Sequence, residues 1–174
     1  MATPESRCAE TPYHIPRLYI EGLESEEYLV LEDGGEARLS RSCSGGPRCF
    51  GKAIYGVSLE ELVDLVSKRA TRSFIVLLPP DYHRGLLVEK GSHVEPIPLN
   101  GIRVVLEACE GDRVEPGSTL GFTVTGKREV RHIRSHVSGV VVYIYSSPYS
   151  RPERNIVFVV PEEEVREVHV VQRE

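Results

Sequence analysis

The residues of this chain best suited to chemistry form one short cationic cluster. Four cations lie within eight positions of one another: Lys127, Arg128, Arg131 and Arg134. Ammonium and guanidinium groups bind carboxylates and phosphates. The favoured interpretation of such a cluster is an ordinary charged strand face. The alternative, in a chain of net charge −5, is contact with an acidic partner or a phosphate-bearing ligand.

Histidines and acids supply the other candidate groups. His132 and His136 are four positions apart and would share a face on a strand. A metal ion needs further ligands, and no others stand at a suitable spacing, so we predict no metal site. Asp81 and His83 follow a Pro-Pro pair, and an enzyme site would use these residues or the cationic cluster.

The four cysteines would be free thiols in an ordinary cytosol. Cys43 and Cys49 close a short loop, so a disulfide between them or zinc ligation by the pair are the alternatives. Cys109 lies in an apolar run, which favours a small buried thiol.

Composition excludes several protein classes. The 174 residues are 40% hydrophobic and 27% charged, as in an ordinary globular protein. No run of 18 apolar residues and no secretory signal occurs, so we expect a cytoplasmic protein without a membrane segment. The acidic net charge argues against nucleic acid as a partner. One Met, one Gln, two Asn and abundant charges indicate a thermophilic source.

The first half of the chain predicts a small α+β domain. Residues 1–15 are polar and aperiodic and predict a flexible tail. In residues 16–85, short apolar runs predict strands, and Ser58 with Glu61 forms a capping box. Leu59, Leu62, Val63 and Val66 then follow at helical spacing and predict one helix.

The second half, residues 86–174, predicts a β-sandwich. Short runs rich in Val and Ile alternate with Gly and Pro turns, which indicates many short strands. The pattern also repeats loosely, since residues 100–124 and 138–160 each contain a Gly, a β-run, a loop and a second β-run. Two such halves would pack face to face around one core.

Two motifs in this half carry a resemblance to a known family. Residues 110–120, EGDRVEPGSTL, resemble the E-G-D-x-V-x-x-G-x-x-L segment of biotinyl and lipoyl domains. Residues 133–141, IRSHVSGVV, resemble their I-x-S-P-V-x-G-V-V segment. The resemblance implies a mainly β chain, in which a small N-terminal α+β unit precedes a barrel-sandwich hybrid domain. The whole chain also resembles a group of uncharacterised archaeal proteins with this C-terminal domain.

The resemblance singles out Lys127 as the position of cofactor attachment. Carriers of this family bind biotin or lipoate on a lysine at the tip of the hairpin between the two halves. Lys127 has the family spacing from Leu120, but Gly139 follows one residue too late. The flanking residues Gly126 and Arg128 also depart from the Met-Lys-Met and Asp-Lys-Ala acceptor patterns.

We therefore expect a non-catalytic binding or scaffold protein that has an unmodified biotinyl/lipoyl-like domain and no cofactor. Its partner would be an unidentified protein, and exposed edge strands also permit a homodimer. The alternatives are a biotin or lipoate carrier modified at Lys127, and an enzyme with a site between its domains.

Overall fold

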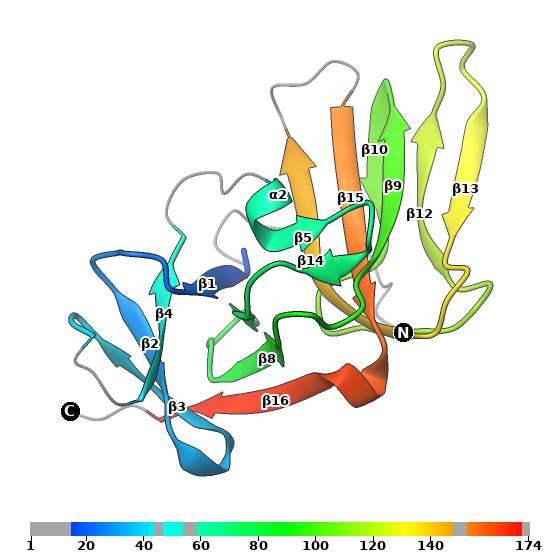
Figure 1. Ribbon diagram of the computed structural model, residues 1–174. Helices are drawn as coiled ribbons and strands as arrows, with labels where there is room; N and C mark the ends of the chain where they lie inside the picture. The colour runs from blue at the N-terminus through cyan, green and yellow to red at the C-terminus, as the bar shows by residue number, and fades with distance from the viewer. Residues whose placement is uncertain (1–14, 44–46, 54–58, 148–152, 172–174) are drawn as a thin grey trace. The chain divides into compact units, whose positions relative to one another are not determined.

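The computed structural model describes residues 15–43, 47–53, 59–147 and 153–171 (Figure 1). The predicted tail, residues 1–15, lies outside the described residues apart from Ile15, and so does Ser58. The chain folds as two compact units. One consists of residues 15–93 and 163–174, and the other includes residues 94–162.

The first unit is a closed β-barrel of seven strands. Around the barrel the order of the strands is β1, β4, β2, β3, β16, β8 and β7. Their bounds are Arg17–Glu21 (β1), Tyr28–Leu31 (β2), Glu36–Ser40 (β3), Arg48–Lys52 (β4), Phe74–Leu77 (β7), Arg84–Val88 (β8) and Val165–Val170 (β16). The last strand comes from the far end of the sequence and pairs antiparallel with β8 and parallel with β3.

Alternating apolar residues of these strands fill the barrel. Tyr19, Leu29, Phe50 and Ile75 are fully buried in one cluster, as expected for strands that present every second side chain to a core. The Tyr19 hydroxyl donates a hydrogen bond to Glu27 Oε2 at 3.0 Å. Burial and the neighbouring carboxylate raise the pKa of Tyr19, so its phenol stays neutral.

The mainly β architecture is confirmed, but the predicted N-terminal α+β unit is wrong. The helix expected from residue 58 onward is a single turn, α2 (Leu59–Leu62). It leads into a two-stranded hairpin of β5 (Val63–Asp64) and β6 (Arg69–Ala70).

Asp64 explains why the helix stops. Its carboxylate accepts the backbone N–H groups of Val66 and Ser67, at 2.9 and 3.4 Å. These bonds lower the pKa of Asp64 and offer the backbone an alternative to helix. Lys68 then adopts a left-handed conformation with φ of 57°. Val66 is consequently 94% exposed and does not join the apolar stripe that the spacing predicted.

The second unit consists of two sheets that share one core. A three-stranded sheet has the order β10, β12, β13, and a four-stranded sheet has the order β11, β14, β15, β9. Their bounds are Glu95–Gly101 (β9), Arg103–Leu106 (β10), Arg113–Val114 (β11), Thr119–Val124 (β12), Val130–Arg134 (β13), Gly139–Ser147 (β14) and Glu153–Val160 (β15). Leu99, Leu120, Val141 and Val157 are fully buried in their shared core.

The two repeated halves of the sequence appear as two antiparallel pairs. β10 pairs with β12, and β14 pairs with β15. We expected residues 86–174 to form this unit alone, whereas β8 and β16 belong to the barrel.

The first motif, residues 110–120, begins with a turn that is hydrogen-bonded to β14. Gly111 has a φ of 94° and donates its N–H to the Val141 carbonyl, while the Asp112 carboxylate accepts the N–H of Cys109 at 2.9 Å. Glu110 Oε1 accepts the N–H of Ile144 at 3.2 Å, beyond a register shift in β14. Burial raises the pKa of the Glu110 carboxyl above its ordinary value.

Glu110→Gln should therefore gain stability relative to the wild type as the pH rises. In the wild type, the folded state holds the Glu110 proton more tightly than the unfolded state does. Stability therefore falls as the pH rises from the unfolded pKa, about 4.3, through the raised folded pKa. The glutamine keeps an acceptor for Ile144 and has no charge to desolvate. Urea unfolding between pH 4 and pH 7 checks this trend, and Glu115→Gln, at an exposed position, should not reproduce it.

Candidate functional site

The cationic cluster lies on the hairpin between β12 and β13. Arg128 donates its N–H to the Thr125 carbonyl, and Thr125 donates its N–H to the Glu129 carbonyl, both at 2.9 Å. Arg128 has a φ of 64°. This is a three-residue hairpin loop in which a turn is followed by one left-handed residue.

This loop geometry accounts for the one residue by which the spacing from Lys127 to Gly139 exceeds the spacing in biotinyl and lipoyl carriers. The bond between Thr125 and Arg128 makes Gly126 and Lys127 the two central residues of the turn. The left-handed Arg128 takes up the additional position. Lys127 therefore remains at the tip of the hairpin, with its side chain exposed.

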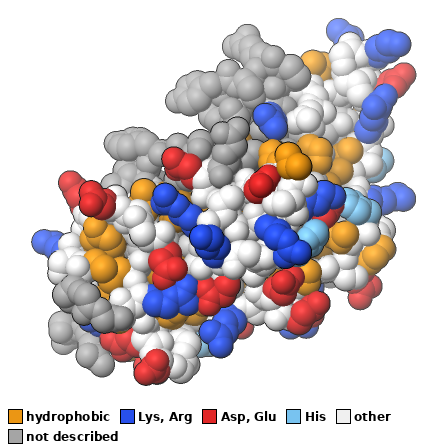
Figure 2. Space-filling view, in the orientation of Figure 1, with side chains coloured by type: hydrophobic (Ala, Val, Ile, Leu, Met, Phe, Trp, Pro, Cys, Tyr) orange, Lys and Arg blue, Asp and Glu red, His pale blue; other side chains and the backbone are white. Residues whose placement is uncertain are grey.

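The four hairpin cations, Lys127, Arg128, Arg131 and Arg134, are all exposed. None of them forms a hydrogen bond or ion pair through its side chain with any other described residue. In the barrel, by contrast, four cations are paired with carboxylates at 2.6–3.4 Å: Arg38, Arg48, Lys52 and Arg84. Figure 2 shows Lys and Arg side chains gathered over the β12–β13 hairpin with an acidic side chain among them, and both charge signs alternating over the barrel.

The structure does not bring the candidate histidines together. The His132 ring lies 6.0 Å from the Phe122 ring, on the neighbouring strand. His136 Nε2 lies 2.9 Å from an oxygen of Glu95, whose side chain is buried. Among the described residues, no three His, Cys, Asp or Glu side chains could hold one metal ion. In the barrel, His83 Nδ1 lies 3.8 Å from Asp81 Oδ2, with both side chains more than half exposed.

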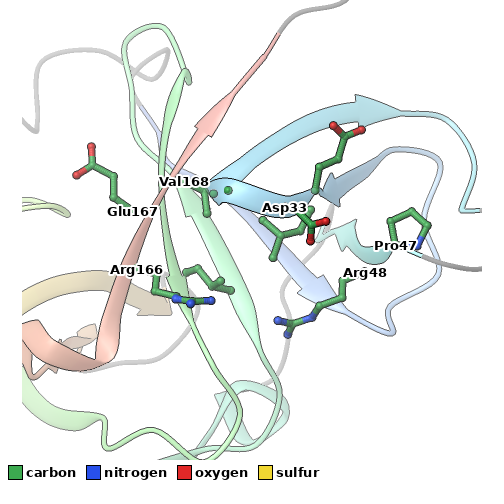
Figure 3. Close-up of a pocket in the computed structure, with 11 residues that line it drawn as sticks. Asp33, Pro47, Arg48, Arg166, Glu167 and Val168 are labelled. Atoms are coloured by element: carbon green, nitrogen blue, oxygen red, sulfur yellow. The ribbon is translucent and has the colours of Figure 1, made fainter.

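An open pocket of about 880 Å³ lies in the wall of the barrel (Figure 3). It opens where β16 and β3 diverge, because only His169 and Val170 of β16 pair with β3. Leu87 and Val168 are among the apolar residues that line it, and Arg48 and Arg166 point toward each other across the space.

Carboxylates already neutralise one of these two arginines. Arg48 Nε lies 2.7 Å from Glu21 Oε2, and Arg48 Nη2 lies 2.7 Å from Glu89 Oε1. The hydrogen bond from Arg48 lowers the pKa of Glu89. Arg48 therefore has no spare positive charge for a ligand.

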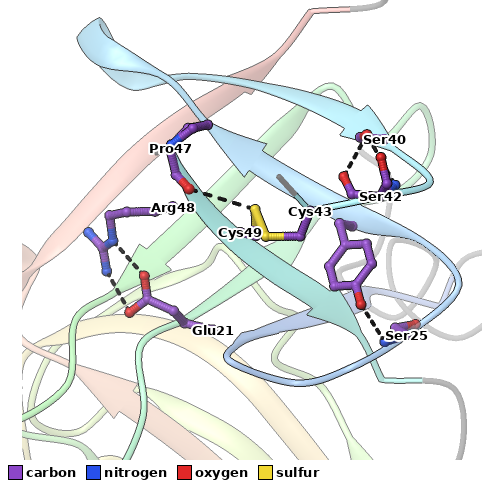
Figure 4. The surroundings of a disulfide bond; sticks show 9 residues. Glu21, Ser25, Ser40, Ser42, Cys43, Pro47, Arg48 and Cys49 are labelled. Carbon is purple, nitrogen blue, oxygen red and sulfur yellow. Dashed lines mark hydrogen bonds and ion pairs between the residues drawn. A yellow bond between two sulfur atoms is a disulfide. The ribbon is translucent and has the colours of Figure 1, made fainter. Parts of the chain in front are cut away.

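The cysteines resolve the alternatives that the sequence left open. A disulfide joins Cys43 to Cys49, which confirms the pairing and rules out zinc ligation by this pair (Figure 4). Cys109 is also disulfide-bonded, so the prediction of a buried free thiol there is wrong.

Comparison with known proteins places the chain in a family. The family model described as an uncharacterized protein conserved in archaea (DUF2118) matches residues 13–162. The chain belongs to this family. A relative, an uncharacterized protein of Methanocaldococcus jannaschii, is 25% identical over 159 residues, which cover 87% of this chain and 94% of the relative.

The sequence of this DUF2118 protein predicts only some of the candidate functional features that the structure contains. Charge spacing identified the hairpin cations, but no signal in the sequence joins Arg48 to Glu21 and Glu89, or assembles the pocket, because the residues come from distant strands. Among the described residues, no helix is long and apolar enough to cross a membrane.

Proposed function

We propose that this protein is a non-catalytic binding protein that docks an acidic partner through the hairpin cations. One observation carries this proposal. The chain has a net charge of −5, yet four exposed cations on one hairpin have no carboxylate partner among the described residues. Pairing such exposed groups costs little desolvation, and each pair contributes up to about 1 kcal/mol to binding an anionic surface. The complementary charge also speeds the encounter with that surface.

The unit that carries the hairpin is, in this proposal, an unmodified biotinyl/lipoyl-like domain. The two motifs, the two paired halves and the hairpin between them support this assignment. The glycines of the first motif also fit, since Gly111 and Gly117 have φ values of 94° and 97° that side chains rarely adopt. The left-handed Arg128 changes the turn that a modifying ligase would read.

Charge reversal on the hairpin tests the proposed function. Fluorescein-labelled deca-glutamate serves as the probe, with anisotropy as the readout at low and at physiological salt. Arg131→Glu combined with Arg134→Glu should weaken binding by about tenfold or more, because each reversal replaces an attraction by a repulsion. Binding should also weaken with added salt.

Arg154→Glu is the matched control. It makes the same kind of charge change at an exposed residue of the same unit, but on β15 rather than on the hairpin sheet. If it weakens binding as much as a single hairpin reversal, the hairpin is not the binding surface.

A biotin or lipoate carrier modified at Lys127 is the second candidate. It is favoured by the position of Lys127, which is exposed at the centre of the hairpin turn. The intact mass of the protein purified from its native source decides between the two. A mass increase of one biotinyl or lipoyl group, located on Lys127, would replace the first proposal by the second.

A further inference from the structure

β13 is an edge strand of its three-stranded sheet, and among the described residues it pairs only with β12. An edge strand offers unpaired N–H and C=O groups to any other extended chain.

The pairing register shows which groups of β13 are free. Thr125 donates its N–H to the Glu129 carbonyl at the end of the hairpin. In an antiparallel pair, hydrogen-bonded residues alternate with non-bonded ones. Arg131 and Ile133 are therefore the residues of β13 bonded to β12, and the N–H and C=O groups of Val130 and His132 point outward.

The side chains beside this free edge define the chemistry of its occupant. Val130 is 57% exposed and lies on the same face as His132, whereas Arg131 lies on the opposite face with Ile133. Arg134 lies on the same face as Val130, and Ile133, beside Arg131, packs against the core, so each face of β13 has one apolar residue and a cation. An extended segment of acidic and β-branched residues, with its acids beside Arg131 or Arg134, fits this edge.

A second copy of the chain fits the edge poorly. Two β13 strands paired antiparallel would bring eight cations together, four from each hairpin. Like charges opposed across strands are destabilising.

Nucleic acid also fits less well than a peptide. Phosphates and sugar oxygens would satisfy the cations but leave the outward carbonyls of Val130 and His132 without donors.

We infer that β13 accepts an acidic, extended segment of a partner protein as an added strand, paired to Val130 and His132. This inference rests on the proposed function and deepens it, because it names the binding mode. The bound chain is held by main-chain hydrogen bonds, and the cations select for acidic residues.

The test uses the full chain and an acetylated, amidated octapeptide of four Glu-Val repeats. Hydrogen exchange of backbone amides is followed by NMR with and without saturating peptide. The amides of Val130 and His132 should exchange about tenfold more slowly in the complex, whereas those of Arg131 and Ile133, already bonded to β12, should change little. This alternation is the signature of strand addition, and a purely electrostatic contact does not produce it.

A second peptide keeps every carboxylate but carries N-methyl groups on its four central residues. It should bind about tenfold or more weakly, because it cannot donate to the outward carbonyls. On the protein side, His132→Pro removes an outward donor without removing a bond to β12 and should weaken the unmethylated peptide similarly. Arg154→Glu again serves as a control.

The outcomes separate this inference from the proposed function. Equal binding of both peptides, without protection of Val130 and His132, would overturn strand addition and leave an acidic docking surface. Failure of all acidic probes would overturn both proposals. Tighter binding of a twelve-residue oligothymidylate, or protection of the same amides in a dimer without peptide, would replace the peptide by nucleic acid or by a second copy.

Discussion

Gly121→Ala should lower the stability of this protein by about 3 kcal/mol. A Cβ at this position of β12 would overlap the carbonyl oxygen of Val105 on β10 and would lie 3.0 Å from Leu99 Cδ2. The carbonyl cannot retreat without breaking the ladder between β10 and β12. Thermal unfolding should show a fall in Tm of about 10 °C, and urea unfolding gives the free energy.

Gly126→Ala provides the control in the same hairpin. A Cβ there meets no atom within 4 Å, so stability should change by no more than about 0.5 kcal/mol. If the two variants unfold at the same midpoint, β10 and β12 do not approach each other as closely as the structure has them.

Shortening the hairpin should turn Lys127 into a substrate for lipoate ligase. Gly139 stands twelve residues after Lys127, one more than in the carriers that the sequence resembles, and the left-handed Arg128 takes up that residue. Deletion of Arg128 combined with Gly126→Asp restores both the spacing and an acidic neighbour. We expect modification to rise from undetectable in the wild type to most of the protein, measured by intact mass after incubation with ligase.

Lys127→Arg in the shortened hairpin removes the acceptor amine and should abolish the added mass. Equal modification of the wild type would contradict the unmodified state that we propose and would favour the carrier. Absence of modification in both chains would show that spacing and the Asp neighbour are not sufficient for recognition.

Periodicity predicted the strands of the second unit well, because alternating Val and Ile between Gly turns has few other interpretations. The two β-runs expected in residues 100–124 are β10 and β12, and those expected in residues 138–160 are β14 and β15. Helical spacing failed after Leu62, because the Asp64 side chain competes for the backbone amides that would have continued the helix. Local pattern is therefore a poor guide where one polar side chain can redirect the backbone.

At the candidate site, too, features set by neighbouring residues could be predicted, whereas features set by contacts between distant residues could not. The hairpin cations are neighbours in the sequence, so their clustering could be predicted. Their lack of carboxylate partners could not, because it depends on which acids the fold brings near. The open edge of β13 likewise depends on the strand order, which residue spacing does not determine.

The position of β16 has a consequence for how the protein is made. This strand closes the barrel between β8 and β3, yet it follows the whole second unit in the sequence. During synthesis, that unit can fold first, since its first and last strands, β9 and β15, pair with each other. The barrel cannot close until residues 165–170 leave the ribosome, and until then β8 and β3 each have an exposed strand edge. A nascent chain stalled before these residues would be left with an open, aggregation-prone sheet.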